Sequence, residues 1–381
     1  MEYLKGTSAD RNEIITFINQ VFDVEFREIM GKVYQSKEEF ESYHHLVKED
    51  GKIMAAVGVY EQTFVVGSSK LKTGCIGSVS VSNEARGKGY MKLLMKKADE
   101  DMRKNHVAIA MLCGLRNRYG FYGYQMGGQV YEFQMEEENI RHTIGWGEDT
   151  AVQLIPVESE DDPALDAIYE LYQKKTMHCR NRDDFYIRSK TWNHKLIQIQ
   201  INNQFAGYYL TNTEQNFIPE IELVDYSQLL QVLKACLLRI DKKSLKVQAH
   251  EWEPEKALKL EQVCEIYESK PNYCYKILDY PVALKAMLEL KQAHDKLDDG
   301  SFLLNVTDVG AFLMTIQAGK VSVVEVDAQA SNQAIDMELS SREVIDALIS
   351  PAFHLYEAQT KSGYPKGWFP LSFSPDYVDL F

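Results

Sequence analysis

The chain has a shortage of positive charge, and this shortage argues against one broad class of partner. Its 42 Lys and Arg residues stand against 56 Asp and Glu residues, which leaves a formal net charge of −14. A protein with this balance repels a phosphate polyanion and raises the local concentration of small cations. We therefore expect no nucleic-acid partner, and a small cationic amine or basic peptide becomes the natural class of substrate.

Long apolar runs and paired cysteines are also missing. No run of about 18 apolar residues occurs, so we expect no membrane-spanning helix and no membrane partner. The 6 cysteines contain no C-x-x-C pair and the 9 histidines show no metal-ligand spacing, so we expect neither a disulfide framework nor a metal. The start of the chain lacks the basic and apolar segments of a secretory signal. Together these absences predict a cytoplasmic protein.

Hydropathy patterns divide the 381 residues into three regions, and they predict an α+β fold. In the first region, a helix is expected to end near Phe22 and a second helix is expected over 89–104. The expected strands of this region are 52–56, 62–66, 76–81 and 107–113. From Val152 the pattern partly repeats, which predicts a second copy of the same unit after a polar linker over 136–150. The third region, from about Pro281, reads as a separate α+β module. The predicted domains are 1–145, 146–280 and 281–381.

A glycine-rich basic turn carries the sharpest signal in the sequence. The strand Val79-Ser80-Val81 leads through Arg86-Gly87-Lys88-Gly89 into the helix that starts near Tyr90-Met91. Free backbone N–H groups and the positive end of the helix dipole favour an anion at such a turn. The spacing fits neither a Walker A loop nor a dinucleotide fingerprint. The structural alternative is an ordinary strand-to-helix connection with an exposed lysine face, formed by Lys88, Lys92 and Lys96.

The pattern Arg86-x-x-Gly89-x-Met91 resembles the acetyl-CoA loop of the GNAT N-acetyltransferases, and Met91 departs from the small residue usual at the last position. The resemblance implies a GNAT fold with acetyl-CoA as co-substrate, the pyrophosphate on the loop and the pantetheine amides along the preceding strand. It assigns the following residues to acetyl-CoA: Val79, Ser80, Val81, Arg86, Gly87, Lys88, Gly89, Tyr90, Met91 and Asn117.

A second motif, Asn117 to Tyr124, resembles the GNAT element Tyr-x-x-x-Gly-Phe, with Tyr119 at the tyrosine position. In that family this tyrosine protonates the departing CoA thiolate. A phenol with an ordinary pKa near ~10 is protonated at neutral pH and can act as such an acid. The alternative is that Tyr119 is a packing aromatic in a Tyr- and Gly-rich turn.

The whole arrangement, together with the ending from Trp368 to Phe381, resembles the Eis family of N-acetyltransferases. That resemblance implies tandem GNAT domains, a sterol carrier protein-like third domain and a homo-hexamer. It also implies that the terminal α-carboxylate, here on Phe381, is the catalytic base. The second copy has 221–228 in place of the loop, without glycine or arginine and with Asp225 added. We therefore expect this copy to be degenerate and unable to bind CoA.

The same resemblance points to the segment after the first helix as the acceptor site. The candidate residues are Phe22, Asp23, Glu25 and Phe26, in which a carboxylate would hold a cationic amine beside an aromatic ring. An acidic helix end flanked by core aromatics is an equally good explanation for any one of them.

The sequence thus predicts an acetyl-CoA-dependent N-acetyltransferase that transfers the acetyl group directly to a primary amine. Aminoglycosides, polyamines and lysine side chains are all compatible with an acidic cleft. Two alternatives from other classes stay open at this point. One is a non-catalytic acetyl-CoA sensor or scaffold, and the other is a protein that binds an apolar ligand through its third domain.

Overall fold

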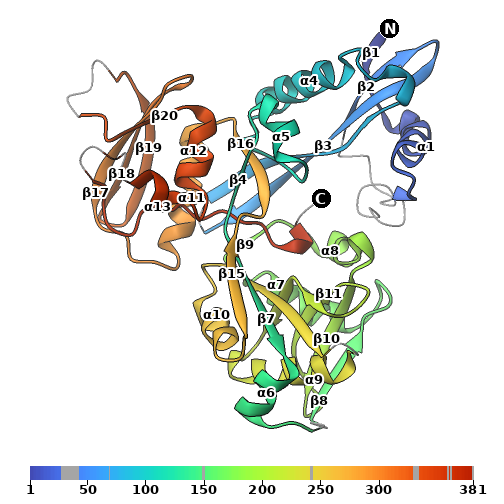
Figure 1. Cartoon of the computed structure of the whole chain (residues 1–381), viewed down its shortest axis with the longest axis vertical. Coiled ribbons are helices and arrows are strands. Elements are labelled where there is room, and N and C mark those ends of the chain that lie inside the picture. The colour runs from blue at the N-terminus through green and yellow to red at the C-terminus, as the bar shows by residue number, and fades with distance from the viewer. Residues whose placement is uncertain are drawn as a thin grey trace.

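The computed structural model describes residues 1–26, 43–67, 69–147, 151–240, 243–328, 334–357, 360 and 363–379. Phe381, the predicted base, lies outside the described residues. The chain forms three lobes, with the N-terminal lobe in blue and teal, the second in green and yellow, and the third in orange and red (Figure 1). No helix among the described residues is long and apolar enough to cross a bilayer.

The first lobe is built on an eight-stranded sheet whose order is β1-β2-β3-β4-β5-β16-β6, with β9 on β3. Its strands are β1 (Glu2–Lys5), β2 (Tyr43–Glu49), β3 (Lys52–Val66), β4 (Ser69–Val81), β5 (Ile109–Leu112), β6 (Gln125–Gly127), β9 (Met177–His178) and β16 (Tyr273–Ile277). The two strands predicted over 52–56 and 62–66 are one continuous β3, because the alternation of buried and exposed side chains runs through residues 60–66. β4 and β5 are parallel.

Two helices cover opposite faces of this sheet. α4 (Tyr90–Lys104) begins directly after Gly89 and buries Tyr90, Leu94, Ala98 and Met102 at intervals of four, as one face of a helix requires. These side chains share a core with Val57 and Val59 of β3. α1 (Arg11–Phe22) packs on the other face, where its core includes Tyr60. Over residues 55–60, β3 therefore presents its odd-numbered side chains to α4 and its even-numbered ones to the α1 face.

The second lobe contains two four-stranded sheets, ordered β13-β11-β10-β8 and β12-β14-β7-β15. Its strands are β7 (Val130–Glu136), β8 (Val152–Pro156), β10 (Lys195–Ile201), β11 (Gln204–Thr211), β12 (Phe217–Ile218), β13 (Glu220–Leu223), β14 (Ser244–Ala249) and β15 (Ile266–Lys270). Its helices are α6 (Glu137–Ile144), α7 (Ala164–Tyr172), α8 (Arg182–Ser189), α9 (Leu229–Arg239) and α10 (Pro254–Glu261).

The first two lobes exchange strands. β16 comes from the end of the second region, yet it pairs with β5 and β6 of the first sheet. In return β7, from the first region, lies between β14 and β15 of the second lobe. Figure 1 shows β7 and β15 running together between the two lobes. The predicted boundaries at 145/146 and 280/281 stay predictions, and strand pairing crosses the first of them.

The two lobes also share an order of elements. β4 is parallel to β5 in the first lobe and α4 lies between them in sequence, while β12 is parallel to β14 and α9 lies between them in the second. In each lobe the strand after this parallel pair is the one received from the other lobe. The shared order supports the predicted repeat, which stays a prediction.

The third lobe packs helices against a four-stranded sheet ordered β19-β18-β17-β20. Its elements are α11 (Tyr280–Gln292), β17 (Gly300–Val306), β18 (Gly310–Gln317), β19 (Lys320–Val326), β20 (Met337–Leu339), α12 (Ser341–Leu348) and α13 (Phe353–Tyr356). α11 begins at Tyr280, because the Asp279 side chain caps it by accepting a hydrogen bond from the Val282 amide at 3.2 Å. The core of this lobe includes Phe302, Phe312 and Trp368.

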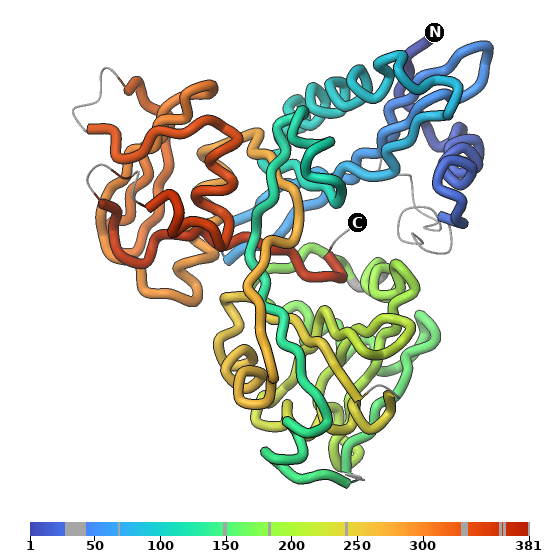
Figure 2. The backbone as a smooth tube through the Cα atoms, viewed as in Figure 1, coloured from blue at the N-terminus to red at the C-terminus, as the bar shows by residue number. Residues whose placement is uncertain are grey.

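From the third lobe, the C-terminal segment returns to the other two (Figure 2). The ring of Phe373 packs edge-on against Phe64 of β3, with 6.0 Å between ring centroids. Further along, the side chain of Gln62 donates a hydrogen bond to the Asp379 carbonyl at 2.9 Å. Phe64 and Gln62 both lie on the α1 face of β3, so the segment runs along this face toward Tyr60.

The second lobe holds two buried carboxylates of this segment. Asp376 lies 3.0 Å from the Lys175 ammonium and 2.9 Å from Nε2 of His250. Burial alone would raise the pKa of Asp376, but Lys175 and His250 lower it well below its usual range. Burial would lower the pKa of His250, yet Asp376 holds it above its usual value. For Asp379, burial raises the pKa against the opposing charge of Arg180.

The strand exchange predicts that residues 1–145 do not fold alone. Without β16, this fragment leaves one edge of β5 and both edges of β6 without a partner strand, and it loses Cys274, Tyr275 and Ile277 from its core. We expect a fragment of residues 1–145 to show no cooperative thermal transition by circular dichroism. The same fragment joined through a flexible linker to residues 271–279 is expected to recover one. A cooperative transition in the fragment alone would contradict the prediction.

The charge cluster predicts a pH-dependent stability. Replacing Asp376 by Asn removes the buried carboxylate paired with His250 and one of the three carboxylates around Lys175, so the free energy of unfolding should fall by about 3–5 kcal/mol. Because the pKa of His250 is raised, its stabilising charge is fully present below its unfolded pKa and is lost as pH rises through its folded pKa. The Asp376→Asn loss, measured by urea unfolding, should therefore shrink as the pH rises above about 6.5, the ordinary pKa of histidine.

The matched control is Asp308→Asn. Asp308 is exposed and accepts a hydrogen bond from the Ser341 amide at 2.7 Å, which an Asn side chain can also accept. We expect a loss of about 1 kcal/mol or less and no change of that loss over this pH range. A loss for Asp376→Asn that grows with pH would contradict the assigned charge pair.

Candidate active site

The candidate site begins where β4 parts from β5. The parallel pairing joins Thr73 to Ile109 and ends with Ile76 opposite Leu112, the last residue of β5. β4 continues to Val81, and no strand of the described chain pairs with residues 77–81 on the β5 side. Backbone N–H and C=O groups are obligatory hydrogen-bonding groups. The backbone N–H and C=O groups of residues 77–81 that face β5 are therefore open to a ligand that enters between the two strands.

The predicted cofactor strand Val79-Ser80-Val81 forms this unpaired end. Val79 and Val81 are half-buried, whereas Ser80 is buried and its hydroxyl donates to the Ser78 carbonyl at 3.1 Å. Ser78 has a left-handed backbone with φ 52°, at a register irregularity between β3 and β4. This irregularity turns the strand away from regular pairing just beyond its last contact with β5.

The glycine-rich turn lies between this strand and α4. Gly87 and Gly89 have φ of 82° and 81°, where a side chain is strained, and Gly89 is the residue that precedes α4. Arg86 is exposed just before the two glycines. Met91, in the first turn of α4, packs partly against the core that this helix covers. The turn therefore brings the N-terminus of a 15-residue helix to the open end of β4.

A carboxylate already pairs with one of the cations of this turn. Glu49, at the end of β2, accepts a hydrogen bond from the Lys88 ammonium at 2.8 Å and another from the Tyr90 hydroxyl. The hydrogen bond from Lys88 lowers the pKa of Glu49, and Glu49 in turn raises the pKa of Lys88. Sequence reasoning missed Glu49, because its place beside the turn depends on the β2–β3 hairpin and not on a motif.

Tyr119 lies at the end of β5. α5 (Arg116–Tyr119) follows the strand by a short turn, and a Cβ built on Gly114 would meet the Tyr119 ring at 2.3 Å. Only glycine at 114 lets the ring lie against the backbone that leaves β5, so Tyr119 lies beside the point of divergence. Burial raises the pKa of Tyr119, with Arg118 opposing, so the phenol is protonated at neutral pH.

Two pockets lie along this region. One has a volume of about 590 Å³ and lies between α4 and the segment 118–124. Its cationic lining consists of Lys92, Lys96, Arg118 and Lys276, and its aromatic lining of Phe121, Tyr122 and Tyr124. The lining includes Lys92 and Arg118, which directly follow the predicted cofactor residues Met91 and Asn117 in sequence, and one carboxylate, Asp99. Asn117, also predicted here, is exposed on α5.

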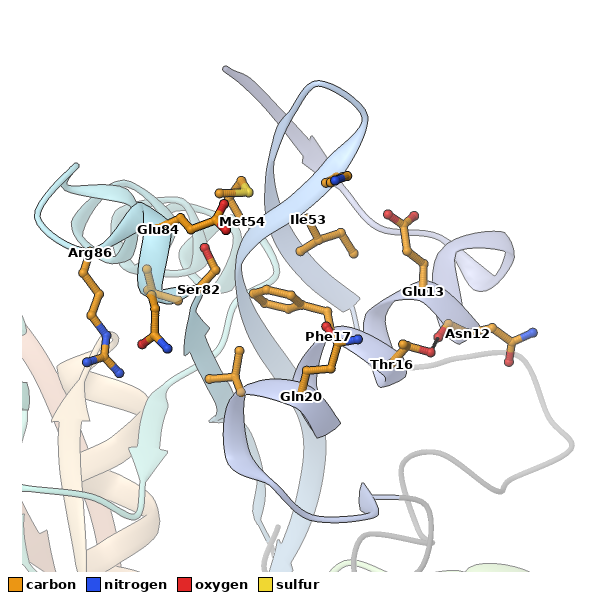
Figure 3. A pocket seen from close by; sticks show the side chains of 14 residues that line it. Asn12, Glu13, Thr16, Phe17, Gln20, Ile53, Met54, Ser82, Glu84 and Arg86 are labelled. Atoms are coloured by element: carbon orange, nitrogen blue, oxygen red, sulfur yellow. Dashed lines mark hydrogen bonds between the residues drawn. The ribbon is translucent and has the colours of Figure 1, made fainter.

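The other pocket, of about 710 Å³, lies between α1 and the open end of β4. Figure 3 shows Phe17 and Gln20 of α1 on one side and Ser82 and Arg86 on the other. Val81 and Arg86, both predicted for the cofactor, line it together with Glu84. The sequence did not predict that α1 lines this pocket. Helical periodicity identifies the buried face of a helix, but it does not say which exposed residues of the helix lie opposite a neighbouring turn.

The four predicted acceptor residues lie at the end of α1. Asp23 ends the helix in a left-handed conformation with φ 56°, and Glu25 is exposed. Phe22 is exposed and its ring lies 5.2 Å from that of Phe26, which is buried in the core beneath α1. They are neighbours of one another but not lining residues of the two pockets above. Within the described residues, no group of three or more His, Cys, Asp and Glu side chains is placed to hold a metal ion.

Comparisons with known proteins agree with this geometry. The model of an acetyltransferase (GNAT) domain matches residues 2–127. No curated protein sequence matches the chain.

Several solved structures have a similar fold over nearly the whole chain. A probable N-acyltransferase from Enterococcus faecalis V583 has 13% identity and a TM-score of 0.69, covering 98% of this chain and 97% of that one. A GCN5-related N-acetyltransferase from Anabaena variabilis has 13% identity and a TM-score of 0.68, with 100% of both chains covered. Eis1 from Mycobacterium abscessus has 12% identity and a TM-score of 0.63, covering 99% of this chain and 98% of that one. At these identities the likeness shows the fold.

The matched range contains α1, the open end of β4, the glycine-rich turn and Tyr119. The predicted first-lobe motifs and the matched domain therefore coincide. Residues 2–127 carry a GNAT acetyltransferase domain, and the chain is an acyltransferase.

Proposed function

We propose that the protein is an acetyl-CoA-dependent N-acetyltransferase that transfers the acetyl group directly to a primary amine of a cationic acceptor. The observation that carries the proposal is the divergence of β4 from β5, with a buried, protonated tyrosine where β5 ends. A thioester between the two strands would have backbone amides on one side and a proton donor at its sulfur.

Each part of acetyl-CoA has a complementary surface in this arrangement. The open backbone of 77–81 suits the amides of pantetheine, as a further strand suits a sheet edge. The turn from Arg86 to Met91 suits the pyrophosphate, at a helix N-terminus with glycines that let the ligand approach the main chain. The pyrophosphate would compete with Glu49 for Lys88. The basic pocket with Lys92, Lys96 and Arg118 suits the remaining phosphate and its adenosine.

The proposed reaction has no acyl-enzyme intermediate. A neutral amine attacks the thioester carbonyl, and backbone N–H groups at Val79 to Val81 stabilise the charge that develops on its oxygen. As the tetrahedral intermediate collapses, Tyr119 donates its proton to the CoA sulfur. The α-carboxylate of Phe381 takes the proton released by the amine, with its usual pKa near ~3.5 raised by desolvation or its action relayed by water.

The acceptor is proposed from charge. The net charge of −14 favours cations near the protein, and Asp23 and Glu25 are exposed beside the Phe22 ring. Aminoglycosides, polyamines and lysine side chains share the required primary amine. The cytoplasmic location and a homo-oligomer, a hexamer by likeness to the Eis family, stay predictions.

The second lobe is proposed to be a degenerate GNAT copy that binds no CoA. In place of a glycine-rich turn, α9 follows Asp225, whose side chain caps the turn by accepting from the Ser227 amide at 2.8 Å. The adjoining β13 carries Glu220 and Glu222, both buried and paired with Lys175. Carboxylates at this place would repel phosphate.

The third lobe is proposed to be sterol carrier protein-like in fold, with aromatic side chains packed in its core. Phe302, Phe312 and Trp368 lie in the core of this lobe, each at most 2% exposed. The ring of Phe312 stacks on Tyr280 with 4.9 Å between centroids.

The first test is thiol release from acetyl-CoA with a panel of aminoglycosides, polyamines and lysine peptides. Amine-dependent release is expected, and Tyr119→Phe should lower kcat by about 10²–10⁴-fold, because it removes the proton donor. Tyr131→Phe is the matched control, since Tyr131 lies on β7 and lines neither of the two pockets. Measurable CoA binding without release for any amine would instead favour the sensor or scaffold alternative.

The base assignment predicts that removing Phe381 alone lowers kcat by about 10²-fold or more while the KM for acetyl-CoA changes little. Phe381→Leu is the control, because it keeps a terminal carboxylate at the same position. Steady-state kinetics with one acceptor of the panel measures both. A shortened chain with the full kcat would show that another group takes the proton.

A further inference from the structure

The described end of the chain is held by two lobes at once through Arg180. This side chain, only 6% exposed, extends from the second lobe, and its Nε donates to the Val378 carbonyl at 3.1 Å. Its Nη2 donates to the Gln62 side chain at 2.8 Å, and Gln62 in turn donates to the Asp379 carbonyl at 2.9 Å. One guanidinium therefore joins the second lobe, β3 and the C-terminal segment.

Tyr172 fixes the side chain of Asp379 in the same place. Its hydroxyl donates to Oδ1 of Asp379 at 2.6 Å and accepts from the amides of Cys179 and Arg180 at 2.9 and 2.8 Å. Two backbone amides thus orient the Tyr172 hydroxyl, and this hydroxyl orients the Asp379 carboxylate. Tyr172 and Asp379 are both fully buried, so water does not compete for these bonds.

The C-terminal segment is held close to the candidate active site. It crosses Phe64 first and Gln62 next, and the following side chain on this face of β3 is Tyr60. The Tyr60 hydroxyl lies 2.8 Å from the Ser78 hydroxyl, at the start of the unpaired end of β4. From Gln62 to Tyr60 is about 7 Å along the strand, and two further residues of chain span at most about 7 Å.

We propose that Arg180 and Tyr172 of the second lobe are positioning residues for acyl transfer, acting through Val378 and Asp379 on the end of the chain. The inference rests on the proposed function, because there the terminal carboxylate is the base. It assigns the second lobe a task in the reaction although that lobe binds no CoA. Misplacing a catalytic group by about 1 Å can lower turnover by about 10²-fold, so such anchoring matters for rate.

The test variant is Arg180→Lys, which keeps the buried charge beside Asp379 but loses the fork that reaches Val378 and Gln62 together. We expect kcat to fall by about 10- to 100-fold and the KM for acetyl-CoA to stay within about twofold. Arg239→Lys is the matched control, because the Arg239 guanidinium donates to the Leu154 carbonyl within the second lobe. Tyr172→Phe is the second variant, since it keeps the ring and loses only the hydroxyl.

Repeating the substitution in a chain that lacks Phe381 separates positioning from a general structural effect. If Arg180 acts through the chain end, Arg180→Lys should lower kcat by less than about twofold in this shortened chain. An equal fall in the full and the shortened chain would overturn the inference. An unchanged kcat for Arg180→Lys and for Tyr172→Phe in the full chain would overturn it as well.

Hydrogen exchange of the Val378 amide gives a readout that does not depend on activity. This amide donates to the buried Glu220 side chain at 3.2 Å, and its exchange should be faster in Arg180→Lys than in the wild type. A wild-type chain without transferase activity would overturn the proposed function, and the exchange would still test the anchoring. An unchanged exchange rate would then overturn the inference itself. A full kcat in the chain without Phe381 would overturn the base assignment and, with it, the inference.

Discussion

The structure depends on the burial of two C-terminal carboxylates. Asp376 and Asp379 lie far from water in a region where an unpaired charge would be strongly unfavourable. Lys175, His250 and Arg180 of the second lobe supply the compensating charges, and Gln62 of the first lobe completes the hydrogen bonds. The three lobes are therefore tied together by one segment, and the segment is fixed only when both other lobes are in place.

The exchanged strands β7 and β16 also fix the first two lobes relative to each other. β16 closes the first sheet beside β5, the strand from which β4 diverges, and β7 lies within the second lobe. A rotation of one lobe against the other would strain two sheets at once. The divergence of β4 from β5 and the anchoring of the C-terminal segment are thus kept in a constant geometry, which is what a direct transfer between two bound reactants requires.

Much of the first lobe could be predicted from the sequence, because the patterns that specify it are local. The helix expected over 89–104 is α4, and the glycines at 87 and 89 have the left-handed backbone that such a turn needs. Tyr119 lies where the motif implied, beside the end of β5. The glycine-rich turn and the tyrosine are close in sequence to the strands that they serve, so spacing alone relates them.

The long-range features were not readable in the same way. The insertion of β16 between β5 and β6 joins residues near 275 to residues near 110 and 126, and no local pattern of alternation specifies a partner so distant. The pairing of Glu49 with Lys88 and the buried cluster around Asp376 are equally non-local. A buried ion pair reads in sequence as two ordinary surface charges until the fold brings its members together. The base on Phe381 and the acceptor residues after α1 stay predictions.

The insertion of β16 also dictates an order of events during synthesis. The first sheet has all its other strands except β9 once residue 127 has emerged from the ribosome, yet its edge at β5 and β6 must wait for residue 277. At roughly 5–20 residues per second, this wait is on the order of 10 seconds. During that time a nascent chain exposes the free edge of β5 and the whole of β6, so chaperone capture at this stage would protect the acetyltransferase domain from pairing with another chain.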